Sequence, residues 1–184
     1  MFSHLKENPP FLFLGINPGG GTKDDRELNP DDGFEYLNAL NPGYEDYALA
    51  RNTRNLFQQA GLYEHLEHSV KTNIYYVITS KAKDLSSLFS LLGDDVDDEF
   101  YRLAHKWTKQ MIELIKPQVI ICEGMEVLEK ISWLYETKPM LETSCGYFEL
   151  KNKIAVIGYS RRFSNIRNEV FVAEFLKTKL AGRL

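Results

Sequence analysis

Five consecutive residues near the N-terminus, Gly15-Ile16-Asn17-Pro18-Gly19, combine the residue types of a ligand-binding turn. Pro18 fixes its own φ angle and has no backbone N–H, whereas the glycines permit close approach of the backbone to a ligand. The Asn17 carboxamide can donate and accept hydrogen bonds but cannot take up a proton near neutral pH. The pentapeptide therefore predicts either a site in which Asn17 positions a reactant or a simple turn, for which Asn-Pro-Gly is also typical.

Apolar segments that alternate with helical patterns indicate the elements that position this turn. Short runs rich in apolar, β-branched and aromatic residues predict strands. The predicted strands cover residues 10–14, 72–79, 118–122, 147–150 and 154–158. Helical spacing and end signals predict the helices. These cover residues 55–62, 98–115, 125–133 and 168–180.

The alternation of strands and helices predicts the fold class. We expect one α/β domain over residues 1–184, built as a three-layer α/β/α sandwich with a mostly parallel central sheet of about four to five strands. The segment from Asn17 to about Tyr47 is rich in Gly, Pro, Asn and Asp. A loop this long inside a compact domain is often functional.

Composition limits the class of protein. The chain has a formal net charge of −4, which argues against a protein that coats nucleic acid non-specifically. Its two cysteines are too few for a disulfide scaffold or an iron–sulfur cluster. We see no apolar run long enough to cross a membrane and no secretory signal, so we expect a cytoplasmic protein that does not bind membranes.

Metal and cofactor sites are not expected. The acidic run at 94–99 precedes a predicted helix, where carboxylates favour the helix dipole, and it lacks the spacing of a calcium loop. His65 and His68 have no third ligand nearby in the sequence. Gly21 stands where a P-loop has its Lys, which excludes a nucleotide triphosphatase of that type.

In open α/β sheets, ligands bind beyond the carboxyl ends of the strands. Four places in this chain satisfy that rule. They are Asn17, the segment 79–81, the pair Glu123-Gly124 and the segment 159–162.

The motif Gly15-Ile16-Asn17-Pro18-Gly19 resembles the first motif of uracil-DNA glycosylases, and closely that of the mismatch-specific (thymine/uracil) branch. Residues 51–62 are similar to the helix that follows the substrate loop in that branch. Residues 117–124 are similar to the third strand of the family. Together these segments cover most of the chain in the family's order.

The resemblance implies a metal-independent DNA glycosylase that flips a base from the stack and hydrolyses its N-glycosidic bond. It implies that Asn17 holds the attacking water and that the backbone near Ile16 donates to the base. Phe34, with Tyr36 as the alternative, would stack on the base. Asn73 would read the uracil edge, or would only satisfy backbone groups. The implied DNA contacts are Gly19, Lys81, Ser160, Arg161 and Arg162.

The last motif departs from the family pattern. Residues 158–165 contain neither the His nor the Pro of the family's His-Pro-Ser segment. Arg161 and Arg162 either grip DNA or are solvated and paired with carboxylates. From the resemblance as a whole, we expect a monomeric glycosylase that acts on damaged or mismatched DNA. The alternatives are a nucleic-acid or nucleobase-binding protein on the same fold and, less favoured, a hydrolase of free nucleosides or RNA.

Overall fold

The computed structural model describes residues 5–17, 33–42, 46–76, 87, 91 and 93–184. Four neighbouring parallel strands form the larger part of its main sheet. β1 (Phe11–Gly15) lies between β2 (Val70–Asn73) and β3 (Val119–Cys122), and β3 pairs in turn with β6 (Ala155–Tyr159). The carboxyl ends of all four strands therefore meet at one edge of the sheet.

Two antiparallel strands extend the sheet beyond β6. β5 (Cys145–Glu149) pairs with β6, and β4 (Met140–Glu142) pairs with β5, which gives the order β2-β1-β3-β6-β5-β4. A separate two-stranded ribbon follows β6. It consists of β7 (Arg161–Arg162) and β8 (Asn165–Ile166), which pair antiparallel.

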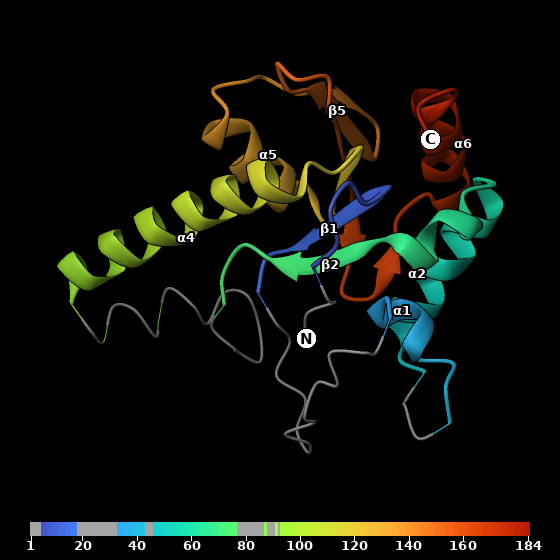
Figure 1. The fold of residues 1–184 in the computed structure, drawn as a ribbon, viewed down its shortest axis with the longest axis horizontal. Coiled ribbons are helices and arrows are strands. Elements are labelled where there is room, and N and C mark those ends of the chain that lie inside the picture. The colour runs from blue at the N-terminus through green and yellow to red at the C-terminus, as the bar shows by residue number, and fades with distance from the viewer. Residues whose placement is uncertain (1–4, 18–32, 43–45, 77–86, 88–90, 92) are drawn as a thin grey trace.

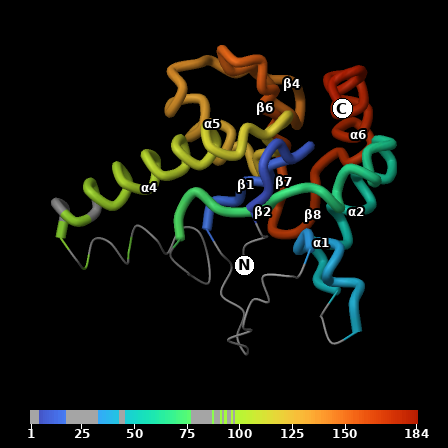
Figure 2. Tube along the Cα trace, in the orientation of Figure 1, coloured from blue at the N-terminus to red at the C-terminus, as the bar shows by residue number. Residues whose placement is uncertain are grey.

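Helices pack against both faces of the sheet (Figure 1). One face is covered by α1 (Glu35–Asn38), α2 (Ala48–Gln59), the 3₁₀ helix η1 (Tyr63–His68) and α6 (Glu169–Leu180). The trace in Figure 2 shows α2 and α6 together on this side of the strands. We call it the α2 face.

The opposite face, which we call the α4 face, is covered by α4 (Asp94–Ile115) and α5 (Met125–Leu134). Strand residues alternate between the two faces because successive side chains point in opposite directions. Phe11 and Phe13 of β1 lie in the core of the α2 face, and Leu12 and Leu14 lie in the core of the α4 face. All four side chains are fully buried.

Two glycines let α5 approach the sheet closely. A Cβ atom added at Gly158 would lie 2.7 Å from Cβ of Leu128, and one added at Gly146 would overlap the Leu128 side chain. Contacts shorter than about 3 Å are not tolerated between carbon atoms that prefer about 3.5–4.0 Å. Leu128 of α5 therefore occupies space that only glycine leaves on β5 and β6.

The predicted α/β architecture with a mostly parallel sheet is confirmed, but the sheet has six strands rather than four to five. The additional strand is β4, which has only three residues, all of them exposed. The strand predicted over 72–79 is wrong in its bounds, because β2 ends at Asn73. Residues 77–79 lie outside the described part of the chain.

Helix α2 begins at Ala48, earlier than predicted. Its buried side chains include Ala50, Thr53, Arg54 and Phe57, which share one helical face through the spacing i, i+3, i+4 and i+7. Two of the four are polar, so the apolar pattern from which a helix is recognised is interrupted. The long predicted loop also contains the short helix α1.

Candidate functional site

A row of four residues crosses the carboxyl edge of the parallel strands on the α2 face. Gly15 of β1 is paired with Asn73 of β2. Cys122 is paired with both Leu14 and Gly158, so the next residues along these strands, Glu123 and Tyr159, continue the row. Asn73, Glu123 and Tyr159 are 3%, 2% and 0% exposed. The sheet therefore buries three polar side chains side by side, with a glycine between the first two.

Gly15 provides the space in which Asn73 and Glu123 converge. A Cβ atom at this position would overlap Oδ1 of Asn73 and would lie 3.5 Å from Oε2 of Glu123. Nδ2 of Asn73 is buried and has no hydrogen-bond partner among the described residues. A buried donor without a partner costs about 1–3 kcal/mol, so this atom is suited to a ligand that brings an acceptor.

The Glu123 carboxylate is held by groups from three elements. Oε1 accepts a hydrogen bond from the hydroxyl of Tyr36 on α1, and Oε2 lies 3.9 Å from Nζ of Lys71 on β2. α5 begins two residues later, after Gly124, whose φ of 136° is strained for any other residue. The positive end of the α5 dipole adds a favourable partial charge beside the carboxylate.

Lys71 joins a second buried carboxylate to this group. Its Nζ lies 3.2 Å from Oε2 of Glu35, and the Lys71 and Glu35 side chains are 9% and 12% exposed. Oε1 of Glu35 accepts a hydrogen bond from the hydroxyl of Tyr47. Lys71 also lies over the ring of Tyr36, 5.1 Å from its centroid. One ammonium group therefore faces two carboxylates in the interior.

Burial and the nearby carboxylates keep the phenols of this cluster protonated. Burial, followed by the charge of Glu123, raises the pKa of Tyr36 well above its ordinary value. Burial and the charge of Glu35 likewise raise the pKa of Tyr47. The pKa of Tyr159 is also raised by burial and by Glu123. Tyr36 and Tyr47 can therefore only act as hydrogen-bond donors to their carboxylates.

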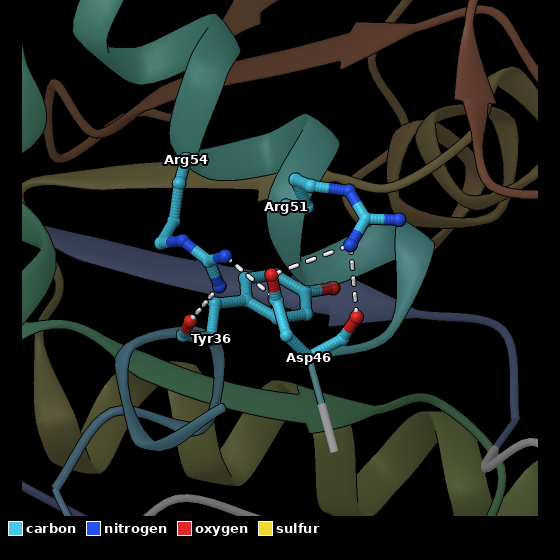
Figure 3. Close-up of polar contacts among 4 residues, drawn as sticks. All are labelled: Tyr36, Asp46, Arg51 and Arg54. Carbon is cyan, nitrogen blue, oxygen red and sulfur yellow. Dashed lines mark hydrogen bonds and ion pairs between the residues drawn. The ribbon is translucent and has the colours of Figure 1, made fainter. Parts of the chain in front are cut away.

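Arg54 of α2 attaches the chain segment that carries α1 to the same cluster (Figure 3). Its Nη1 donates to the backbone oxygen of Tyr36 at 2.6 Å, and its Nη2 lies 2.6 Å from Oδ1 of Asp46. Asp46 also contacts Arg51, with Nη1 to Oδ2 at 3.3 Å. Hydrogen bonding from Arg54 lowers the pKa of Asp46. Arg54 thus fixes both α1 and the segment that follows it to α2.

The structure brings some predicted site residues to this edge. Asn17 lies two residues beyond the end of β1 and is partly exposed. Ile16 turns to the α4 face, and its carbonyl oxygen accepts a hydrogen bond from the backbone N–H of Tyr75 at 2.9 Å. Asn73 lies in the row described above. Gly19 and Lys81 lie outside the described residues.

Phe34 lies in the core directly before α1. It is 1% exposed, and its ring centroid is 5.1 Å from that of Phe13 and 5.3 Å from that of Tyr36. Tyr36, the other predicted stacking residue, is fully buried and bound to Glu123. Both aromatic rings therefore line the α2 face beneath the strand ends.

The arginine-rich segment after β6 forms a hairpin. Backbone N–H groups of Ser160 and Arg167 donate to Ser144 and Ser160, respectively, which ties the hairpin to the sheet. Nε of Arg161 lies 4.0 Å from the position of a Cβ added at Gly124, so Arg161 borders the Glu123 corner. Arg162 is exposed. The hairpin connection carries Phe163, which is 83% exposed and has a positive φ of 55°.

Sequence reasoning missed several members of this site. Glu123 was placed at a strand end where ligands can bind but was given no catalytic role, and Lys71, Glu35 and Phe163 were not considered. Only the structure shows that Lys71 is unusual, because it places Lys71 on the same face as Asn73 in a strand whose four residues are all buried. A Lys at such a position requires a buried counter-charge.

An open hollow of about 670 Å³ lies elsewhere, at the N-terminal end of α6. Its lining includes Val170, Phe171, Glu169 and Glu174. Val170 is 73% exposed, and the lining is mostly apolar. Because it lacks buried polar groups that converge, we favour the strand ends as the functional site.

Within the described part of the chain, no three His, Cys, Asp or Glu side chains are grouped so that they could hold a metal ion. No helix among the same residues is long and apolar enough to cross a membrane. Both cysteines, Cys122 and Cys145, are buried and unpaired, and burial raises the pKa of each thiol.

Comparison of the sequence with models of protein families and with curated proteins finds no match in either. The proposed function therefore depends on the residues and the geometry of the strand ends.

Proposed function

We propose that this protein is a DNA glycosylase of the uracil-DNA glycosylase type, which hydrolyses the N-glycosidic bond of uracil or a related damaged or mismatched base. The resemblance of residues 15–19 to the family's first motif supports the proposal. The position of this motif at the carboxyl end of a central parallel strand is consistent with it, because open α/β sheets bind their ligands there.

The observation that carries the proposal is the carboxamide of Asn73. It is buried over Gly15, and its Nδ2 has no partner among the described residues. A pyrimidine carbonyl oxygen is an acceptor of the kind that this donor lacks, and an adjacent ring N–H suits the carboxamide oxygen. A uracil edge offers both groups side by side, so the base would remove the cost of the unpaired donor.

The reaction requires no group beyond those at the strand ends. The bond between C1′ and the base nitrogen breaks, and its electron pair leaves with the base. The oxygen of a water molecule held by Asn17 then bonds to C1′, and the water proton passes to solvent or to the departing base. Positioning of the water and backbone N–H groups near Ile16 that face the base anion would lower the barrier.

The hairpin of β7 and β8 supplies the features of a DNA contact. Arg161, Arg162 and Arg167 provide positive charge for phosphates, and Ser160 provides a hydroxyl group. Phe163 exposes an aromatic ring between them. Exposed aromatic side chains stack on unpaired bases or enter the space that a flipped base leaves.

A Phe163→Ala variant is expected to bind damaged DNA about tenfold more weakly, because base–aromatic stacking contributes roughly 1–3 kcal/mol. Its free energy of unfolding should change by less than about 0.5 kcal/mol, since the ring is exposed. Fluorescence anisotropy with an abasic-site duplex measures the affinity. Phe171→Ala on α6 is the matched control, and equal affinities of the two variants would remove Phe163 from the DNA interface.

The proposal is tested by excision under single-turnover conditions with EDTA present. The substrates are duplexes and single strands that contain uracil, hypoxanthine or mismatched thymine. An Asn73→Leu variant should lose about 10²-fold in excision of the preferred base while its stability is unchanged or raised. Leu has the same branching as Asn and removes a buried donor that has no partner among the described residues.

Two results would contradict this reading. If wild-type protein leaves every base intact, the glycosylase proposal fails. If such a protein still binds abasic DNA, the same fold serves as a nucleic-acid-binding protein. If the protein excises a base but Asn73→Leu is as active as wild type, Asn73 is a structural residue and the base is read elsewhere.

A further inference from the structure

Among the described residues, the buried cluster below the strand ends holds two carboxylates, of Glu35 and Glu123, around one ammonium group, that of Lys71. Lys71 is the shared cation of Glu35 and Glu123, and the three side chains are at most 12% exposed. Arg54, the nearest other buried cation, is already paired with Asp46. Tyr36 and Tyr47 donate hydrogen bonds to the two carboxylates but bring no charge.

Glu123 is a buried carboxylate at the strand ends, beside Gly15. Its Oε2 and the carboxamide of Asn73 both approach the space above Gly15, two residues before Asn17. Glu35 lies behind Lys71 on α1. Since the Glu123 side chain is 1% exposed, its charge acts through a protein interior that weakens it much less than water would.

The proposed reaction creates charge at this place. When the bond from C1′ to the base breaks and the electron pair leaves with the base, the sugar becomes cationic until water adds to C1′. A fixed negative charge that is present before the reaction stabilises such a cation without any reorganisation. The carboxamide of Asn17 cannot supply this charge, because it is neutral.

We propose that Glu123 is the residue whose negative charge stabilises the cationic sugar, and that it acts across space and not by contact. This inference rests on the proposed glycosylase function. Asn17 positions water and Asn73 binds the base. Glu123 stabilises the charged transition state more than the neutral substrate. Such a group raises the rate of bond cleavage without strengthening the binding of uncharged DNA.

Positive charges and hydrogen-bond donors surround Glu123. Lys71 faces it from β2, Tyr36 from α1, the N-terminal end of α5 follows it in the chain, and Arg161 borders it from β7. Tyr159 lies beside it on β6 and stays protonated, because burial and Glu123 raise its pKa. Each of these neighbours is a cation, a partial positive charge or a hydrogen-bond donor.

The test compares two abasic-site analogues in otherwise identical duplexes. One carries a pyrrolidine ring, which is cationic at neutral pH, in place of the sugar; the other carries a neutral tetrahydrofuran ring. The ratio of their dissociation constants at one fixed salt concentration measures the preference for positive charge. We expect wild-type protein to bind the pyrrolidine duplex at least about tenfold more tightly.

Substitutions separate the charge of Glu123 from its structural role. Glu123→Gln keeps the shape and an acceptor for Tyr36, and should bring the ratio close to one while the affinity for the tetrahydrofuran duplex is unchanged. Glu123→Asp, which restores the charge, should recover part of the preference. Glu174→Gln on α6 removes a 65% exposed carboxylate and should leave the ratio at the wild-type value.

The outcomes distinguish the two proposals. If wild type binds both analogues and Glu123→Gln keeps the full preference for pyrrolidine, the role of Glu123 is disproved and the glycosylase proposal stands. The same holds if wild type binds the two duplexes equally. If wild type binds neither analogue and excises no base, the glycosylase proposal fails, and the inference about Glu123 fails with it.

Discussion

A Lys71→Met variant is expected to lower the free energy of unfolding by about 3–5 kcal/mol, because it leaves buried carboxylates without their cation. Lys71 is the ion-pair partner of both Glu35 and Glu123, at 3.2 and 3.9 Å. Met fills a similar space, so the loss arises from charge and not from a cavity. The loss is large relative to the 5–15 kcal/mol by which proteins are usually stable.

Urea denaturation at neutral pH, followed by circular dichroism, measures this loss. Lys177→Met is the matched control, because Lys177 is 63% exposed and lies 4.0 Å from the equally exposed Glu174. It should change stability by less than about 1 kcal/mol. A Lys71→Met variant as stable as this control would show that the buried ion pairs of Lys71 contribute no more to stability than an exposed pair.

An Asn17→Ala variant is expected to lose about 10²–10³-fold in the rate of base excision, with little change in DNA affinity. Asn17 is partly exposed and directly follows β1, where a side chain can hold a water molecule against C1′. Removing a group that orients a reactant or stabilises a transition state typically costs this much. Because the side chain is at the edge of the core, the fold should tolerate its loss.

Single-turnover excision from a uracil-containing duplex, with EDTA present, gives the rate, and an abasic-site duplex gives the affinity. Asn52→Ala provides a comparison, because Asn52 is also an amide near the site but donates to the backbone oxygen of Ser164 at 2.8 Å. Equal rates for Asn17→Ala and wild type would show that another group holds the water. A parallel loss in both Asn variants would indicate general damage to the site.

The fold could be predicted well where a strand coincides with an apolar run in the sequence. Phe11–Gly15 and Val119–Cys122 are short apolar runs that end at turn signals, and each became a buried parallel strand. β4 was not predictable, because Met140–Glu142 is short and exposed, and only its pairing with β5 defines it. Periodicity detects burial, so a strand that buries no side chain leaves no pattern.

The candidate site could be predicted only in part. Asn17 was identified because it follows a predicted strand within the family-like motif, and Asn73 through the resemblance alone; the register then aligned Asn73 with Gly15. The ion cluster depends on contacts between residues far apart in the chain, such as Tyr36 with Glu123. A Lys, Glu or Tyr in an amphipathic segment is usually solvated, so nothing local distinguishes Lys71 from a surface lysine.

The packing of Leu128 against two glycines limits which substitutions the chain can accept without moving Glu123. α5 begins directly after Glu123-Gly124, so the depth at which α5 rests on the sheet determines how far Glu123 extends over Gly15. A lineage that acquired a larger residue at position 146 or 158 would have to accept a smaller one at position 128, or lift the helix and withdraw the carboxylate. Positions 128, 146 and 158 should therefore vary together among the descendants of this protein, although none of them touches a ligand.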